Sequence, residues 1–572
     1  MKKFLLISFS FIFLYSCSDS KNNDINIPLT SEIESLVEHT KEFEKKVLSY
    51  ETPGGRIHFA IGFGIANSIM VEGENGNVII DAADSVYEAE QIYSLFSKKN
   101  NNPIRAIIYT HNHGDHTFGA AYYVKSQEVK PQIIAHEDTD YYVQRIMGIL
   151  NPIITSRSTR MFGTSLPEEE VINVGIGPNL SVSKSPTGYV KPDTTFSDNL
   201  KLNIEGIELE LYHAPGETND QIFIWLPKHK ALMPGDNIYK TFPNLYTIRG
   251  TTHRDVKGWI DSIDHMKTFE PEYLFPSHTK PILGKETIKD ALDIYRDAIQ
   301  YIHDQTIRLM NQGLYPDEIA DIIQLPDELA NSPYLYEFYG TVRWSVKSIF
   351  NGYLGWFSGN PSELDPLSRK DKALRISSLA GGNDRLLEQL HLAVKNEDMQ
   401  WALELSDYLI SLDLFTDEVK ELRIEALIYE GSRSSNPNKR NYFLTSAFEL
   451  NGSIRETSLL DRTSEDLLHQ ISIHTLFDVL STRYDPEREY NKNYKVCFSF
   501  ASGVTKNIIL RNKVAVVTNN FEDNCDLKII SDEIEFKKTL TGLSNPVSQI
   551  TTGDLIVEGS STEFLKFLTK FR

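Results

Sequence analysis

The stretch Thr110-His111-Asn112-His113-Gly114-Asp115-His116 decides the fold, and it comes directly after a short apolar run. Three histidines and one aspartate lie within six of these residues, and zinc and similar metals favour such imidazole and carboxylate ligands. His111 and His113 alternate as along an extended segment, so they can share one ion, while Asp115 and His116 turn toward a second ion. The stretch therefore predicts a loop that serves two metals. A polar loop that merely caps a strand is the alternative, and the density of ligands counts against it.

Three later segments have the same design, in which an apolar strand runs into a turn that carries a carboxylate or an imidazole. They are Leu211 to Thr218, Ala231 to Asn237 and Tyr273 to His278. Open sheets bind ligands at the ends of their strands. We therefore expect four strand ends to converge on one point.

The residues before the histidine-rich stretch alternate strands with helix. Ala66 to Val71 and Val78 to Asp81 are expected as neighbouring strands, and Ser85 to Lys98 as a helix. Asp81 ends its strand ahead of an Ala-Ala turn. Its carboxylate either orients the metal loop from behind or simply breaks the strand, and the sequence leaves both interpretations open.

At these residues the chain resembles the metallo-β-lactamase superfamily, with its pattern H-x-H-x-D-H, then P-G-H-T, then G-D, then a final His. Glu217 stands where the second motif usually has His. That acidic residue, the segment Asn237 to Gly250 and the stretch Gly352 to Ser368 resemble the alkylsulfatases that hydrolyse dodecyl sulfate. The resemblance implies an α/β fold, the αββα sandwich, followed by an all-α dimerisation domain and an α+β domain like sterol carrier protein type 2.

The resemblance also implies the site residues and two Zn²⁺ ions per subunit. One zinc would take His111, His113 and Glu217, the other Asp115, His116 and His278, with Asp236 bridging. Asp115 and Asp236 would be catalytic, and Asn244, Tyr246 and Arg249 would bind sulfate. The chain departs from the relatives at Asp236, where they have Glu.

The implied activity is zinc-dependent hydrolysis of an alkyl sulfate to an alcohol and inorganic sulfate. Hydrolysis of a lactam, lactone or phosphoester on the same dinuclear site is the alternative reaction. The feature that discriminates is the trio Asn244, Tyr246 and Arg249, which suits a tetrahedral anion better than a lactam. A lipid-binding lipoprotein with a vestigial metal domain is the non-enzyme alternative. His253 is a possible acid, although an exposed loop histidine is the simpler interpretation, and His58, His136 and His213 are expected to be packed and hydrogen-bonded.

The predicted domains are 36–286 for the catalytic unit, 287–452 for helical dimerisation and 453–572 for the C-terminal domain. Helices are expected over Tyr334 to Leu354 and over Glu465 to Tyr484, and strands over Tyr494 to Phe500 and Leu527 to Ser531. The resemblance predicts a homodimer. Whether the C-terminal domain holds an apolar ligand or has a filled core stays open.

The N-terminus predicts export. Lys2 and Lys3 precede the apolar run Phe4 to Tyr15, which is too short to span a bilayer and fits a signal peptide over 1–16. The end of this run resembles a bacterial lipoprotein signal, in which Cys17 is lipidated and anchors a tether over 17–35 to the membrane. We expect a periplasmic or outer-membrane-associated protein. A plain secretory signal is the alternative.

The composition of the chain limits the classes of partner that it is expected to bind. With 572 residues and a formal charge of −21, the chain is acidic and does not suit nucleic acid, whose phosphates require a basic surface. An anionic substrate must therefore be drawn by a local positive patch. Beyond Cys17 only Cys497 and Cys525 remain, and they either pair or stay inert and buried, with no catalytic role.

Overall fold

A computed structural model describes residues 27–28, 30–178, 186–454, 465–488, 493–519 and 524–571. The predicted signal peptide and Cys17 lie outside these residues. The tether predicted up to residue 35 overlaps the short helices η1 (Ser31–Ile33) and α1 (Glu34–His39), and Ile33 is buried. Folded structure therefore begins before residue 36. Within the described ranges, every helix is too short or too polar to cross a bilayer.

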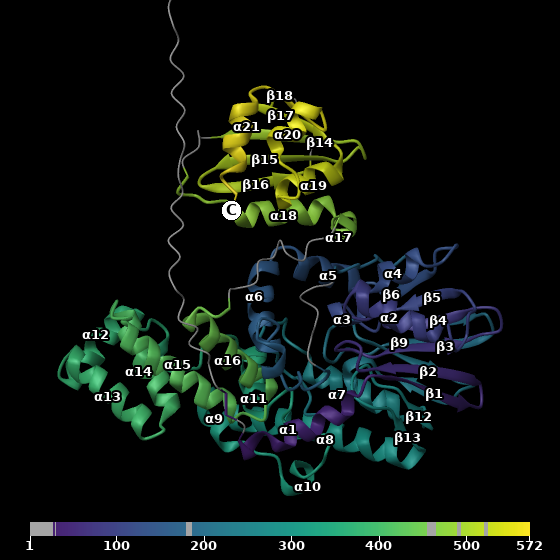
Figure 1. The fold of residues 1–572 in the computed structure, drawn as a ribbon, viewed down its shortest axis with the longest axis horizontal. Helices are drawn as coiled ribbons and strands as arrows, with labels where there is room; N and C mark the ends of the chain where they lie inside the picture. The colour runs from purple at the N-terminus through teal and green to yellow at the C-terminus, as the bar shows by residue number, and fades with distance from the viewer. Residues whose placement is uncertain are drawn as a thin grey trace, which may run out of the picture.

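Two sheets face each other in the N-terminal half of the chain (Figure 1). The first has seven strands in sequence order: β1 (Lys46–Thr52), β2 (Gly55–Ile61), β3 (Ser68–Glu72), β4 (Asn77–Ile80), β5 (Ile104–Ile108), β6 (Gln132–His136) and β7 (Thr194–Phe196). The second sheet has six strands, and each strand lies beside the next one in the sequence. They are β8 (Asn199–Ile204), β9 (Ile207–His213), β10 (Ile222–Leu226), β11 (Ala231–Met233), β12 (Tyr273–Leu274) and β13 (Ile282–Leu283).

Helices cover the outer face of each sheet, because the central strands, such as β4 and β10, are buried on both faces. One core, which includes Ile80, Ile108 and Ile224, lies between the sheets. The outer face of the first sheet packs on α2 (Val86–Phe96), α4 (Ala120–Lys125) and α5 (Thr139–Met147). The outer face of the second packs on α7 (Val256–Lys267), α8 (Lys285–Met310), α9 (Pro316–Ile322) and α11 (Val342–Leu354). The predicted αββα sandwich is confirmed.

Shorter elements complete this half of the chain. They are η2 (Thr40–Phe43), α3 (Gly114–Thr117), α6 (Asn151–Phe162), η3 (Glu168–Glu170), η5 (Gly235–Asn237) and α10 (Asp327–Ala330). The helix expected over Ser85 to Lys98 is α2. The Ser85 hydroxyl caps it by accepting hydrogen bonds from the backbone N–H groups of Tyr87 and Glu88.

A helical region follows, with its own core. Its elements are η6 (Pro361–Glu363), α12 (Arg369–Ala380), α13 (Asn383–Lys395), α14 (Met399–Ser411), α15 (Asp417–Ser432) and α16 (Pro437–Asn451). The helix predicted from Tyr334 is wrong at its start, since α11 begins at Val342 after the capping hydroxyl of Thr341. The residues before Thr341 run instead beside the first domain, where the Phe242 N–H donates to the Tyr336 carbonyl.

The C-terminal domain is α+β, as predicted. Its helices are α17 (Glu465–Gln470), α18 (Ile473–Arg483), α19 (Glu533–Thr541), α20 (Pro546–Thr552) and α21 (Ser561–Leu568), and its five-stranded sheet has β14 (Tyr494–Phe500), β15 (Thr505–Arg511), β16 (Val514–Thr518), β17 (Leu527–Ser531) and β18 (Leu555–Glu558). The single helix predicted from Glu465 to Tyr484 is two helices, because Ser472 breaks the run and caps α18. Cys497 and Cys525 form a disulfide across a separation of 28 residues.

The C-terminal domain sits over α5 and α6, at the top of Figure 1. The Gln144 side chain on α5 donates to the carbonyl of Gln470 at 2.8 Å and accepts from the N–H of Ser472 at 3.1 Å. These contacts place the C-terminal domain against α5, which also walls the candidate site.

Candidate metal centre

The histidine-rich loop follows β5, and a residue at the end of the parallel neighbouring strand β4 holds it by hydrogen bonds. Asp81, which follows β4, accepts a hydrogen bond from the Thr110 N–H at 2.9 Å and another from the Thr110 hydroxyl at 3.0 Å. The same carboxylate lies 2.8 Å from His116 Nδ1 and accepts from the Ser277 hydroxyl at 2.8 Å. With φ at 60°, Asp81 also turns the chain. Both interpretations of Asp81 therefore hold, and the orienting one is the more consequential.

The second sheet brings its strand ends to the same place. Asp236 lies in η5 after β11, and His278 follows β12, which is parallel to β11. His278 Nδ1 lies 3.0 Å from the carbonyl oxygen of Ile65, to which it donates, so Nε2 faces the site. The converging strand ends that the sequence predicted are thus found at one edge of the sandwich.

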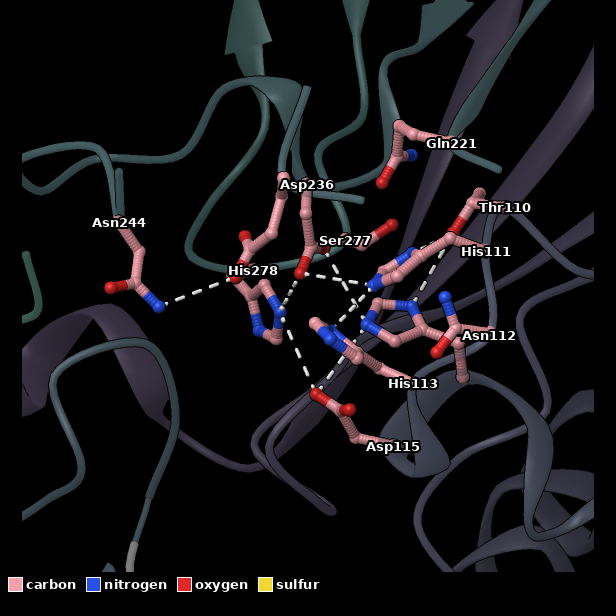
Figure 2. A network of polar contacts seen from close by, with 12 residues as sticks. Thr110, His111, Asn112, His113, Asp115, Gln221, Asp236, Asn244, Ser277 and His278 are labelled. Carbon is pink, nitrogen blue, oxygen red and sulfur yellow. Dashed lines mark hydrogen bonds and ion pairs between the residues drawn. The ribbon is translucent and has the colours of Figure 1, made fainter. Parts of the chain in front are cut away.

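Two clusters of potential metal ligands result (Figure 2). One consists of His111, His113 and Asp236, the other of Asp115, His116 and His278, and the ligand atoms within each lie within 4.8 Å of one another. The nearest nitrogens of His111 and His113 are 2.9 Å apart, closer than two ring nitrogens lie unless they share a proton or an ion. The geometry of both clusters suits a metal ion.

Asp236 stands between the clusters. Its Oδ2 lies 3.6 Å from His111 Nε2 and 3.1 Å from His278 Nε2, while Oδ1 lies 3.5 Å from His116 Nε2. One carboxylate therefore faces ligands of both clusters, which is the position that a bridging ligand requires. Figure 2 shows Asp236 and His278 pointing toward His111 and His113 from the opposite sheet.

Burial and neighbouring charges shift the pKa values of the potential ligands in different directions. Burial, together with the neighbouring His116, lowers the pKa of His111 to about 4. Burial would raise the pKa of Asp115, but the positive charges of His116 and His278 outweigh it and bring that pKa to about 2. Burial likewise opposes the change at His278, where the charge of Asp236 prevails and raises the pKa to about 9. Deprotonated ligands are thus available to a cation, which would displace the remaining protons.

The residues fit a metal by a second criterion. Two buried ligand atoms, His116 Nε2 and Asp236 Oδ1, have no hydrogen-bond partner in the described part of the chain. Leaving such atoms unsatisfied costs about 1 to 3 kcal/mol each, so buried polar atoms normally have partners. The two atoms belong to different clusters and lie 3.5 Å apart, and a cation bound beside them would satisfy both.

Glu217, predicted as a ligand of the first zinc, joins neither cluster. Its carboxylate pairs with the buried guanidinium of Arg254 at 2.8 Å and lies 3.4 Å from the Asn244 amide and from the Tyr239 hydroxyl. Burial raises the pKa of Glu217 to about 7, although Arg254 opposes the change. The role of Glu217 as a ligand stays a prediction.

Arg249 reaches the metal centre. Its Nη2 lies 3.0 Å from His113 Nε2 (the second ring nitrogen), so the guanidinium adjoins the first cluster. Both residues line a cavity of about 240 Å³, here called the metal cavity, together with Asp115, Glu217 and Asp236. Of the other predicted sulfate ligands, Asn244 is buried beside Glu217, and Tyr246 lines neither this cavity nor the one described below.

Sequence reasoning missed two residues of the site. Arg254 follows His253, which is exposed and lies outside the metal cavity, and only its position beside that histidine could have drawn attention. Tyr339 lines the metal cavity from the segment that was expected to be helical. The side-chain amides of Asn436, which caps α16, and of Asn438 in its first turn donate to the Tyr339 carbonyl at 3.2 and 3.0 Å.

The three strand histidines that the sequence analysis singled out, His58, His136 and His213, are packed and hydrogen-bonded as expected. His58 lies 2.7 Å from Glu72, His136 lies 2.9 Å from the Ser197 carbonyl, and His213 lies 2.7 Å from the Asn219 carbonyl.

The αββα sandwich with this histidine and carboxylate site defines a metal-dependent hydrolase of the metallo-beta-lactamase superfamily, whose family model matches residues 61–278. Residues 315–453 match the family described as alkyl sulfatase dimerisation, and residues 461–572 match alkyl sulfatase C-terminal. The linear primary-alkylsulfatase of Pseudomonas sp. (strain ATCC 19151) is 33% identical over 518 residues, which cover 88% of this chain and 98% of that protein. The chain belongs to the alkylsulfatase family, as the sequence predicted.

Two further comparisons agree. The alkyl/aryl-sulfatase of Saccharomyces cerevisiae is 26% identical over 89% of this chain and 80% of its own. The structure of a stereoselective inverting sec-alkylsulfatase from Pseudomonas sp. superimposes with a TM-score of 0.86 at 22% identity, over 96% of this chain and 88% of that one. This second likeness establishes that the whole three-part fold is shared.

Proposed function

We propose that the protein hydrolyses alkyl sulfate esters to an alcohol and inorganic sulfate, with two zinc ions bound at the clusters around Asp236. The observation that carries the proposal is the metal cavity, because it joins three features in one space. Asp115 and Asp236 supply metal ligands, Arg249 supplies a cation for the sulfate group, and an apolar wall accommodates the alkyl chain.

The apolar wall comes from α5 and α6. Its side chains are Val143, Ile146, Met147, Ile154 and Phe162. Burying one methylene contributes about 0.8 kcal/mol, so each carbon of the chain that contacts this wall should lower KM about fourfold. A lactam or phosphodiester that carries no alkyl chain gains nothing comparable from this wall.

Arg249 is the residue that we propose holds the sulfate group. Its guanidinium presents paired N–H donors in a plane, which match two oxygens of a tetrahedral anion. Its distance of 3.0 Å from His113 places the anion beside the first cluster. When bound, the two metal ions would supply the Lewis acidity that makes water a nucleophile near neutral pH. Asn244 and Tyr246 stay proposed sulfate ligands on the family resemblance.

The experiment measures sulfate release from primary and secondary alkyl sulfates by zinc-loaded protein, with a β-lactam, a lactone and a phosphodiester as controls. Arg249→Ala and Asp236→Ala should both abolish release, and only Asp236→Ala should also reduce bound zinc below two ions per chain. Arg511→Ala, which removes an exposed arginine of β15, should keep full activity. Turnover of a control substrate without any alkyl sulfate would refute the proposed substrate while leaving the metal site intact.

We also propose a homodimer formed through the helical region. Large apolar side chains are exposed there, including Trp356 at 73% and Leu379 at 85%. Both lie within the residues that match the alkyl sulfatase dimerisation family. Trp356→Glu with Leu379→Glu should convert a dimer to a monomer in light scattering, and a monomeric wild type would refute the proposal.

Finally, we propose that the chain is exported and anchored by a lipid on Cys17. The disulfide between Cys497 and Cys525 supports export, since such bonds persist in oxidising compartments. Cys17→Ser should move the protein from the membrane fraction to the soluble periplasmic fraction and abolish palmitate labelling. Labelling that persists in this variant would refute lipidation at Cys17.

A further inference from the structure

A second cavity adjoins the metal centre. It has a volume of about 200 Å³, room for an anion with several waters, and it shares His113, Arg249, Ile146 and Ile154 with the metal cavity. Figure 2 shows His113 among the ligands of the metal centre. The second cavity therefore reaches the place where the proposed reaction releases its products.

Its charge differs from that of the metal cavity. Arg145, Arg157 and Arg249 line the second cavity, here called the arginine cavity, and no aspartate or glutamate does. Four carboxylates line the metal cavity: Asp84, Asp115, Glu217 and Asp236. In a chain with a net charge of −21, a cavity lined by three arginines and no acid is the local positive patch that an anion requires.

The two additional arginines are free to bind a ligand. Arg145 on α5 and Arg157 on α6 are partly buried, and neither forms a hydrogen bond or ion pair with any residue in the described ranges. Arg160, on the same helix as Arg157, is different, because its guanidinium pairs with Glu449 at 2.9 Å. A partly buried guanidinium without a carboxylate keeps its full attraction for an external anion.

Arg157 also lies next to the loop that carries Arg249. A Cβ built on Gly250, the neighbour of Arg249, would lie 3.9 Å from Arg157 Nη1. The hydroxyl residues Thr251 and Thr252 line the same wall and can donate to an anion. An anion that leaves Arg249 would thus meet a second guanidinium, that of Arg157, in the same cavity.

We infer that the arginine cavity binds free inorganic sulfate and is the route by which this product leaves, while the alcohol stays against the apolar wall of the metal cavity. The inference rests on the proposed function, since it assigns one product of that reaction to a separate site. Arg249 lines both cavities, so it could contact the anion as the anion moves from one cavity to the other. A tetrahedral sulfate group could also reach these arginines as the head group of an incoming ester, and the test separates the two sources.

The experiment compares zinc-loaded wild type with the double variant Arg145→Gln/Arg157→Gln, and with Arg511→Gln as a control for the loss of exposed positive charge. Binding of inorganic sulfate is measured by calorimetry without turnover, at constant ionic strength, and inhibition by sulfate and by octanol is measured during alkyl sulfate hydrolysis. We expect the double variant to bind sulfate about tenfold more weakly by both methods, with unchanged inhibition by octanol. Arg511→Gln should match wild type.

Two results would overturn the inference. Sulfate affinity that is unchanged in the double variant would show that the arginine cavity does not hold the free anion. A raised KM for the ester with an unchanged sulfate inhibition constant would identify these arginines as an entry site for substrate instead. Because the calorimetric measurement needs no turnover, a protein that fails to hydrolyse alkyl sulfates would refute the proposed function and leave the sulfate-binding test valid.

Discussion

Replacing Asp81 by Asn tests whether the metal loop depends on a carboxylate that touches no metal. Oδ2 of Asp81 interacts with His116, Ser277 and the Thr110 hydroxyl, and Oδ1 accepts the Thr110 N–H. An asparagine amide has a single acceptor oxygen, so either orientation turns an N–H group toward at least one of these donors. Because φ is 60° at this position and asparagine tolerates that conformation, the substitution leaves the backbone unstrained.

The magnitude follows from the loss of charge. Hydrogen bonds to a charged group contribute about 1.5 to 3 kcal/mol, against about 0.5 to 1.5 kcal/mol for neutral ones, and His116 depends on such a bond for its orientation. Loss of a residue that hydrogen-bonds to a metal ligand typically lowers metal affinity about 10- to 100-fold, or about 1.4 to 2.7 kcal/mol. We expect Asp81→Asn to weaken zinc binding by this factor.

The assay is competition for zinc between the protein and a fluorescent chelator, with sulfate release measured at saturating zinc. Asp193→Asn is the matched control, because Asp193 also accepts a backbone N–H, from Ile133 at 2.9 Å, but lies on the surface with Lys130. That variant should bind zinc as wild type does. If Asp81→Asn folds normally and binds zinc with undiminished affinity, Asp81 serves only as a turn residue and the reasoning fails.

Three further outcomes are expected. Replacing both Cys497 and Cys525 by Ser should lower the unfolding free energy of the C-terminal domain by about 3.5 kcal/mol in chemical denaturation, as expected for a crosslink across 28 residues. The Arg254→Met variant leaves the buried Glu217 unpaired, so it should lose about 3 to 5 kcal/mol of stability, seen as a lower Tm. Burial lowers the pKa of His39 to about 4, although its hydrogen bond to the Gly175 carbonyl opposes the change, so wild type should lose up to about 3 kcal/mol more stability than His39→Leu as the pH falls from 6.5 to 4.

The sign of the histidine effect follows from proton uptake. His39 is neutral in the folded chain at pH 5, whereas the unfolded chain, with an ordinary pKa of 6.5, binds a proton there. Stability from this group is therefore complete above pH 6.5 and declines as the pH falls toward 4. Equal stability-versus-pH profiles for wild type and His39→Leu would contradict this prediction.

Reduction of the wild-type disulfide serves as the control for the cysteine variant, and Arg511→Met serves as the control for Arg254→Met.

The sequence predicted the parts of the site that lie on strand ends. Asp236 and His278 follow apolar runs, and two sheets of such runs bring their ends together, so the pattern of apolar runs was enough to predict convergence. The environment of Glu217 could not be predicted in this way. Its partner Arg254 comes from a loop, and loop conformations follow from tertiary packing that no periodicity records.

The two errors in the predicted helix bounds have a similar cause. The residues from Tyr334 have enough apolar character to continue a helix, but packing against the first domain holds them in an extended path until Thr341 caps α11. Ser472, likewise, ends one helix and caps another within a stretch whose apolar spacing suits a single helix. In both places a local capping residue, and not the apolar pattern, determines where the helix starts.

Tyr339 has a consequence for how this protein can be divided or recombined. Tyr339 lines the metal cavity, yet its carbonyl accepts hydrogen bonds from two asparagines at the start of α16, nearly a hundred residues later in the chain. The boundary that separates the sheets from the helices is therefore not a boundary of the active site. A chimera with the sheets of one alkylsulfatase and the helices of another would combine cavity walls from both parents. Its substrate preference should therefore differ from that of either parent.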